Sequence, residues 1–241
     1  MISKLAVVET ENIGKNVTIS EFCVIRDNVK IGNNVTIHPN VVIYQGVEIN
    51  DDVEIFSGAV IGKKPKKMIS LARTPQFKNI VIIGKGTSIG VHAVIYYDVQ
   101  IGSHTLIGDG ANIREQCVIG NSSLIGRYAT INYNVKIGNK TKLMSYANIS
   151  GNCEIGDNVF IGVGVITPND NKIIDREYNQ NVKSANIEDD VSIGSGAIIL
   201  PNLNIGKGSL IGAGAVVTKN TKQYEQVMGV PAKHVRFIEY K

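Results

Sequence analysis

The sequence predicts an all-β chain wound into a triangular prism of parallel strands, and three observations predict this fold. An isoleucine recurs every six residues, from Ile13 to Ile61, from Ile83 to Ile161 and from Ile187 to Ile211, with Phe77 and Leu143 in the same register. The fifth position of almost every hexad is small, and the fourth is most often Asn, Asp or Gly. A short apolar segment and a residue that tolerates left-handed backbone angles make one side and one corner of a coil. Three hexads per turn then give about ten stacked coils.

The composition agrees with this interior. Aromatic residues make up only 6% of the 241-residue chain and Trp is absent. Isoleucine alternating with small residues can fill a prism at the usual packing density without rings. The three cysteines, Cys23, Cys117 and Cys153, all occupy the fifth hexad position. We therefore expect them to be small buried hydrophobic residues, not nucleophiles or metal ligands.

Charge and hydropathy exclude several classes of protein. A formal net charge of +4 is too small to imply a nucleic-acid partner or a membrane surface. No stretch approaches the roughly 20 apolar residues that span a bilayer. The N-terminus has no apolar core of the kind a secretory signal needs. These features predict a soluble, cytoplasmic protein.

The repeat is interrupted twice, at residues 67–76 and 167–186, and it ends at residue 216. We therefore expect a prism domain over residues 1–216 with two loop excursions, followed by a short C-terminal tail over 217–241. Loops that leave a rigid scaffold are favoured places for ligand contacts. Lysines precede the first loop, at a solvated corner or in contact with substrate phosphates; they are Lys63, Lys64, Lys66 and Lys67.

One side of the prism differs from the other two. In the middle block two sides carry Gly at the second hexad position almost throughout, whereas the third side carries none. That side has Lys78, Tyr96, Arg114, Asn132 and Ser150 there, followed by Tyr97, Asp98, Glu115, Tyr133 and Asn134. Solubility alone would not select one side for polar and aromatic residues. This side is therefore predicted to line a subunit interface or an active-site groove.

The histidines do not form a metal site in the predicted fold. The chain has four, and His92 and His104 lie on different sides of the prism with no third nearby. A zinc hydratase would hold its metal with three histidines. We therefore expect no metal requirement.

Several hexads carry a family signature. The segments IGNNVT (31–36), IGDNVF (155–160) and IGAGAV (211–216) resemble the Ile-Gly-x-x-small-x repeat of the hexapeptide-repeat acyltransferases. The resemblance covers most of the chain. It implies a left-handed parallel β-helix of about ten triangular coils with two loop excursions and a short C-terminal tail. It also implies a homotrimer.

The resemblance further implies acyl-coenzyme A as co-substrate. The segment GVPAKHVR (229–236) is similar to the Gly-x-Pro-Ala-Lys/Arg motif that follows the last coil in many coenzyme-A-dependent members. In relatives this region borders the pantetheine and the nucleotide of coenzyme A. The positions expected to contact the coenzyme are Gly162, Gly164, Ala213, Lys219 and Lys233.

The second loop affects the choice of acceptor. The sugar O-acetyltransferases of this superfamily carry a catalytic His in the loop corresponding to residues 167–186, and this loop contains none. A hydroxyl nucleophile needs such a base. An amine with a pKa of about 8 is partly neutral at physiological pH and already nucleophilic. The departure favours N-acylation of an amino sugar.

A second resemblance suggests roles for the polar side. SGAVIGKKPK (57–66) and the loop after it are similar to a segment of the acyltransferase that begins lipid A synthesis. In that family one hexad supplies a base and the next coil a His; the matching positions are Glu115 and Asn134. We expect Glu115 to accept a proton, or else to pair with Arg114 or a trimer partner. Asn134 or the Tyr133 N–H would stabilise the oxyanion, and Asp98 would orient the amine.

These expectations combine into one reading. The protein would transfer an acyl group, expected to be acetyl, from coenzyme A to the amine of a nucleotide-linked amino sugar. The acceptor would be bound by Tyr96, Tyr97, Arg114 and Asn132. The alternatives are O-acetylation of a sugar hydroxyl and a non-catalytic β-helix scaffold.

Overall fold

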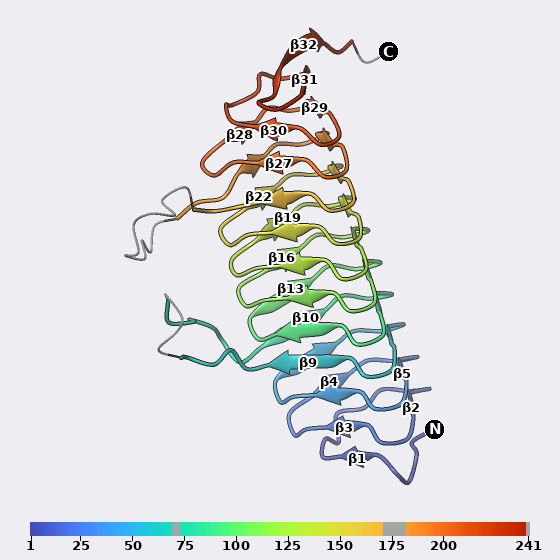
Figure 1. Cartoon of the computed structure of the whole chain (residues 1–241). Coiled ribbons are helices and arrows are strands. Elements are labelled where there is room, and N and C mark those ends of the chain that lie inside the picture. The colour runs from blue at the N-terminus through green and yellow to red at the C-terminus, as the bar shows by residue number, and fades with distance from the viewer. Residues whose placement is uncertain (69–72, 171–181, 240–241) are drawn as a thin grey trace.

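The structure is a computed structural model that describes residues 1–68, 73–170 and 182–239. Its chain forms a β-solenoid of about 11 turns with the arrangement of a left-handed β-helix (Figure 1). Each turn contributes one strand to each of three sheets. The predicted all-β prism is therefore confirmed, with about one turn more than the repeat count suggested. The described residues include no helix with the length and apolar character needed to cross a membrane.

Sheet 1 has 11 strands, stacked in parallel in this order. They are β1 (Val7–Val8), β3 (Val24–Ile25), β6 (Val42–Ile43), β9 (Val60–Lys63), β12 (Val94–Tyr96), β15 (Asn112–Ile113), β18 (Thr130–Ile131), β21 (Asn148–Ile149), β24 (Ile166–Thr167), β27 (Ile198–Ile199) and β30 (Val216–Val217).

Sheet 2 has nine strands. They are β4 (Lys30–Ile31), β7 (Val47–Ile49), β10 (Val81–Ile83), β13 (Val99–Ile101), β16 (Val118–Ile119), β19 (Lys136–Ile137), β22 (Glu154–Ile155), β25 (Asn186–Ile187) and β28 (Asn204–Ile205).

Sheet 3 has 12 strands, of which the last two come from the C-terminal tail. They are β2 (Thr18–Ile19), β5 (Thr36–Ile37), β8 (Glu54–Ile55), β11 (Ser88–Ile89), β14 (Leu106–Ile107), β17 (Leu124–Ile125), β20 (Lys142–Leu143), β23 (Phe160–Ile161), β26 (Ser192–Ile193), β29 (Leu210–Ile211), β31 (Glu225–Met228) and β32 (Lys233–Phe237). The tail therefore folds over the last coil, with β32 antiparallel to β31.

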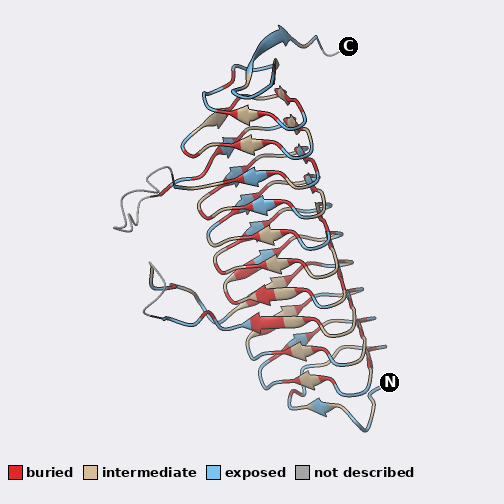
Figure 2. Ribbon diagram, in the orientation of Figure 1, coloured by how far each residue is buried: buried red, intermediate tan, exposed pale blue. Residues whose placement is uncertain are grey.

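The core consists of the first and fifth residues of the hexads, which form the buried interior in Figure 2. Ile113 and Ile131 stack in register in sheet 1, and both are fully buried. Cys117 and Cys153 lie in this core, and burial raises the pKa of each thiol to about 12. Such thiols remain protonated at neutral pH, as expected of small core residues.

The corners form at the fourth hexad position, as predicted. Asn residues such as Asn134 (φ 53°) adopt left-handed backbone angles there, and so do bulkier residues such as His92 and Tyr128. This conformation is disfavoured for most L-residues. Backbone hydrogen bonds from each turn to the neighbouring coils hold the chain in this conformation.

The first excursion is longer than the predicted 67–76, whereas the second matches the predicted 167–186. The first runs from the end of β9 at Lys63 to the start of β10 at Val81, and the second from Thr167 to Asn186. Phe77, predicted to begin a hexad, lies outside any strand because β9 pairs directly with β12. Both excursions leave sheet 1 and return in sheet 2, so both emerge from the same corner of the prism (Figure 1).

Candidate functional site

The turns between the two excursions form what we call the site corner, where sheet 1 passes into sheet 2. It comprises the turns at residues 96–98, 114–116, 132–134 and 150–152. The excursions emerge from the same edge, one before and one after this set. The polar side predicted from the sequence is thus an edge of the prism, framed by the two loops.

Glu115 is at the centre of this corner. Its side chain is fully buried, although it occupies a turn. The guanidinium of Arg73, from the first excursion, donates to Oε1 of Glu115. Arg114 donates from Nε to Oε2 and from Nη2 to Oε1, both at 3.2 Å. Pairing with cations and hydrogen bonding are what allow a carboxylate to be buried here.

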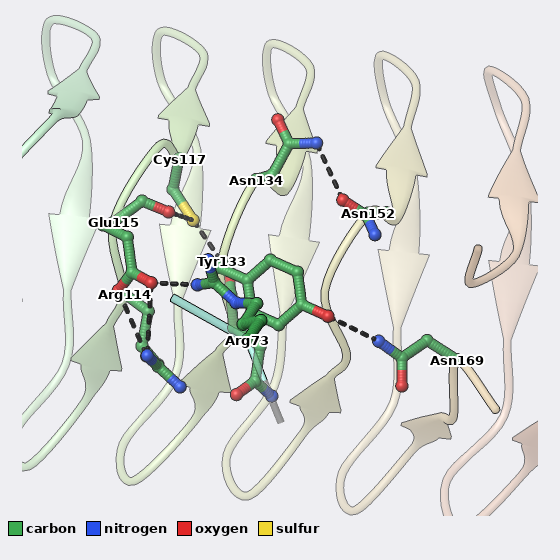
Figure 3. Close-up of polar contacts among 9 residues, drawn as sticks. Arg73, Arg114, Glu115, Cys117, Tyr133, Asn134, Asn152 and Asn169 are labelled. Atoms are coloured by element: carbon green, nitrogen blue, oxygen red, sulfur yellow. Dashed lines mark hydrogen bonds and ion pairs between the residues drawn. The ribbon is translucent and has the colours of Figure 1, made fainter. Parts of the chain in front are cut away.

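Tyr133 links the two excursions. The guanidinium carbon of Arg73, which belongs to the first excursion, lies 3.5 Å from the centre of the Tyr133 ring. The phenol oxygen accepts a hydrogen bond of 3.3 Å from Asn169 Nδ2, which belongs to the second excursion (Figure 3). Asn169 also donates to the carbonyl of Gly151.

Gly151 makes room for this ring. A Cβ atom at residue 151 would lie 2.4 Å from the Tyr133 ring carbon Cζ. Such a contact is far inside van der Waals distance, so only glycine leaves the ring in its place. Gly151 occupies the third hexad position, which carries Glu115 and Tyr133 in the two preceding coils. In this coil the position therefore has no side chain.

Two pockets flank the stack of Arg73 on Tyr133. One of about 290 Å³ is lined by both of these residues together with Arg114 and residues that include Asn132, Ser150, Gly151, Asn169 and Asp170. The other, of about 300 Å³, is lined by the same pair with residues that include Gln116, Asn134 and Asn152. We call the first the arginine pocket. It brings together charged, aromatic and amide groups from both excursions.

The amides of the corner are bonded to one another. Asn134 Nδ2 donates to Asn152 Oδ1 at 2.8 Å, and the Asn134 backbone N–H donates to the Glu115 carbonyl. Asn132 Nδ2 donates to Asn148 Oδ1 and to the Ile149 carbonyl. The Asn134 amide nitrogen has two N–H donors, and the bond to Asn152 uses one of them.

The structure brings some of the predicted site residues together and separates others. Glu115, Arg114, Asn132, Tyr133 and Asn134 meet at or behind the two pockets. Arg73 and Asn169 were not predicted, because they lie in the interruptions, where residues have no register. Gly151 lies within the repeat and was not predicted because it has no side chain.

The remaining predicted residues of this corner lie outside the pockets. Tyr97 is 5% exposed, and its hydroxyl donates to the Gln45 carbonyl; burial raises the pKa of this phenol. Its ring stacks on Phe77, so it supports the first excursion instead of facing a ligand. Tyr96 is half-buried with Lys63 Nζ 4.9 Å from its ring centre, and Asp98 is one coil before Glu115.

Three of the residues predicted to contact coenzyme A, Gly162, Gly164 and Ala213, lie at another edge, where sheet 3 passes into sheet 1. We call the last three turns there, with Gly164, Gly196 and Gly214, the glycine strip. Each of these has a positive φ, and a Cβ on any of them would meet no atom within 4 Å. Gly162 begins the first turn, and Ala213 is exposed in the last. Lys219 and Lys233 are exposed in the tail.

The four histidines lie away from the arginine pocket. His38 pairs with Glu54, and His234 pairs with Glu225 in the tail. His92 and His104 occupy turns, with their rings over Gly58 and Gly86. No group of three or more potential metal ligands occurs in the described parts of the chain.

Comparison with known proteins identifies relatives over parts of the chain. Serine acetyltransferase of Buchnera aphidicola is 38% identical over 91 residues, which are 34% of this chain and 33% of that protein. The 2,3,4,5-tetrahydropyridine-2,6-dicarboxylate N-acetyltransferase of Clostridium perfringens is 46% identical over 55 residues, 23% of each chain. The chain spans about a quarter to a third of the length of the curated relatives it matches.

A solved structure shares the fold over nearly the whole chain. The UDP-N-acetylglucosamine acyltransferase of Arabidopsis superposes with a TM-score of 0.67 at 22% identity, covering 98% of this chain and 74% of that one. The model of the bacterial transferase hexapeptide family (six repeats) matches residues 12–45, 28–63, 98–133, 134–169 and 184–219. Since these matches cover more than half of the sequence, the protein belongs to the bacterial transferase hexapeptide family.

Proposed function

We propose that the protein transfers an acyl group, acetyl in the simplest case, from coenzyme A to the amine of a nucleotide-linked amino sugar. The observation that carries this proposal is the arginine pocket, a polar pocket framed by two loops on a prism of the transferase hexapeptide family. Relatives named as acetyltransferases support acyl transfer. The fold shared with an acyltransferase of a nucleotide sugar is compatible with such an acceptor.

The glycine strip supports coenzyme A as the donor. Its turns expose backbone to the surface with no side chain above Gly164, Gly196 or Gly214. The N–H groups of these glycines donate to the preceding coils, so what the strip provides for an extended pantetheine arm is a smooth track free of side chains. Lys219 and Lys233, exposed in the adjoining tail, are proposed partners for the phosphates of the coenzyme.

The chemistry of the pocket favours an amine over a hydroxyl. The pocket offers arginine, tyrosine and amide groups, and the chain's histidines lie elsewhere. A neutral amine can attack the thioester carbonyl without a base. The C–N bond forms as the carbonyl becomes an oxyanion, and the C–S bond then breaks to release the coenzyme A thiolate. The ammonium proton passes to that thiolate, whose ordinary pKa is near 8.5.

The predicted catalytic residues fit this scheme in different ways. We assign oxyanion stabilisation to the Tyr133 N–H or to the side-chain amide of Asn134, as expected from the sequence. Proton uptake goes to the leaving thiolate and not to Glu115, because its carboxylate is covered by two guanidinium groups. Asp98, which would orient the amine, is not a lining residue of the arginine pocket.

The proposed assembly is a homotrimer. In one chain the glycine strip and the site corner are on opposite edges of sheet 1. A threefold arrangement would allow the strip of one copy to face the site corner of its neighbour, joining donor and acceptor in one groove. Light scattering of the purified protein tests this stoichiometry, and a monomer at catalytic concentrations would contradict it.

The reaction is tested with acetyl-coenzyme A and a panel of UDP- and dTDP-linked amino sugars, following thiol release and product mass. We expect turnover with an amino sugar and none with the matching hydroxy sugar. Turnover with hydroxyl acceptors alone would establish O-acetylation instead. Failure to bind coenzyme A would favour a scaffold without catalysis.

A further inference from the structure

Two guanidinium groups share one buried carboxylate at the site corner. Glu115 is the acidic partner that the described residues provide for both Arg73 and Arg114. One carboxylate balances one of these two positive charges. A second anion close to both would complete the balance, and the low-dielectric surroundings would strengthen its attraction.

The two side chains have hydrogen-bond donors left for such an anion. A guanidinium has five N–H groups in a planar fork. The bonds to Glu115 use one nitrogen of Arg73 and two of Arg114. Both residues line the arginine pocket, where their side chains retain 17% and 26% exposure. Their remaining donors are therefore available from the pocket side.

The neighbours of Arg73 fix its orientation. Its guanidinium carbon lies over the Tyr133 ring, 3.5 Å from the ring centre, and Asn169 from the other excursion donates to the phenol oxygen. A guanidinium that is already stacked and paired loses little freedom when it binds a tetrahedral or planar anion. Arg73 and Arg114 are thus preorganised to bind an anion. Anchoring the loop alone would not require this arrangement.

We propose that Arg73 and Arg114 form a clamp for a phosphate group of the acceptor, and that Glu115 is the positioning residue that holds the clamp. The identity of this ligand rests on the proposed function, in which the acceptor carries a nucleoside diphosphate. Asp170, an exposed carboxylate at the pocket rim, is engaged in an interaction of its own. Bidentate guanidinium–phosphate bonds are the interaction this geometry suits.

Coenzyme A carries the same diphosphate chemistry, so the experiment must separate the two sources. The wild-type protein is titrated calorimetrically with inorganic pyrophosphate, UDP, dTDP, uridine and coenzyme A, each without the other substrate. The variants are Arg73→Met and Arg114→Met, which keep the unbranched apolar stem of the side chain and remove its charged guanidinium group. The matched control is Arg26→Met, because Arg26 is exposed and pairs with Glu9 in the first coils, before the first excursion.

We expect UDP, dTDP or pyrophosphate to bind the wild type, and each clamp variant to weaken this binding at least about tenfold. Arg26→Met should leave this binding unchanged. Uridine, which lacks the phosphates, should bind more weakly than UDP, and its affinity should be the same in the wild type and in the clamp variants. Coenzyme A affinity should be the same in all four proteins. Loss of coenzyme A affinity with intact nucleotide binding would overturn the assignment to the acceptor. Equal binding in the clamp variants and the control would overturn the clamp itself.

These outcomes are distinguishable from failure of the proposed reaction. A protein that binds UDP through Arg73 but acylates no amino sugar would refute the reaction and support the clamp. A protein that acylates an amine without measurable affinity for nucleotide or pyrophosphate would refute the clamp and leave the reaction standing.

Glu115→Gln separates positioning from proton transfer. Because Gln keeps the shape but introduces N–H donors against two guanidinium groups, we expect KM for the acceptor to rise about tenfold with little change in kcat. The shape of the kcat/KM pH profile should remain that of the wild type. Loss of the acidic limb of this profile would show that Glu115 is the base and would contradict its positioning role. Unfolding midpoints of all variants are measured to confirm that they fold.

Discussion

The guanidinium of Arg73 lies over the ring of Tyr133, with its central carbon 3.5 Å from the ring centre. The two residues come from different coils, one from an excursion and one from a tight turn. The contact joins the first excursion to the prism beside a pocket. It makes the position of a loop residue depend on the repeat.

The energy of this contact can be measured by a double-mutant cycle. Arg73→Met and Tyr133→Leu each remove one partner, and we expect a coupling of about 0.5–2 kcal/mol in unfolding free energy, as for a partly desolvated cation–π pair. Chemical denaturation of the four proteins provides the values. Strict additivity would show that the stack contributes nothing beyond the separate contacts of each residue.

Gly151→Ala should displace Tyr133. The new methyl group would lie 2.4 Å from the ring carbon Cζ, so the ring must move away from Arg73 and Asn169. We expect a loss of about 1–3 kcal/mol in stability, together with weaker binding of UDP. Ser192→Ala, at a half-exposed position of β26 outside the arginine pocket, is the control and should change neither quantity. In a Tyr133→Leu background the penalty of Gly151→Ala should shrink, and an undiminished penalty would locate the clash elsewhere.

Thr105→Val tests a buried ladder of hydroxyl groups inside the prism. Thr105 Oγ1 donates to the Gly120 carbonyl at 2.9 Å and accepts from the Ser123 N–H. Valine has the same shape without these bonds, so we expect a loss of about 1–2 kcal/mol. Thr130→Val, at a half-exposed position of β18, is the matched control, and its thermal midpoint should move little. Equal shifts in the two variants would mean that the internal hydroxyls do not stabilise the stack.

Stability should fall at alkaline pH because of two buried thiols. Burial raises the pKa of Cys117 and Cys153 to about 12, whereas the unfolded thiols titrate near 9. The folded state thus favours the neutral thiol, and this contribution is complete below pH 9 and is lost progressively as the pH rises from 9 toward 12. Within that window each cysteine should lower the free energy of unfolding by roughly 1 kcal/mol for each unit that the pH rises.

The measurement compares the wild type with a Cys117→Ala, Cys153→Ala double variant by denaturation at pH 7, 8, 10 and 11. The two slopes should agree below pH 9 and diverge above it, with the wild type losing stability faster. Identical slopes throughout would contradict the burial of these thiols. Iodoacetamide should label either residue only after unfolding.

Some features of the site could be read from the repeat. Register alone placed Arg114, Glu115, Asn132 and Tyr133 on one edge, because every third hexad stacks. The interruptions located both loops. The repeat could not identify Arg73 or Asn169, since residues inside an excursion have no register. Tyr97 was predicted to face a ligand and instead packs beneath the first loop, because its hydroxyl finds the Gln45 carbonyl there.

The sequence by itself determined the coil. An isoleucine at every sixth residue and a turn-forming residue three positions later fix side, corner and core wherever the period holds, because each coil repeats the packing of its neighbour. Only the tertiary structure decided that both excursions leave from one edge and that Arg73 and Arg114 meet on Glu115. Those contacts join loop residues to distant coils, and local periodicity carries no information about them. The site therefore lies where the repeat is interrupted, and its contacts could not be predicted from the period alone.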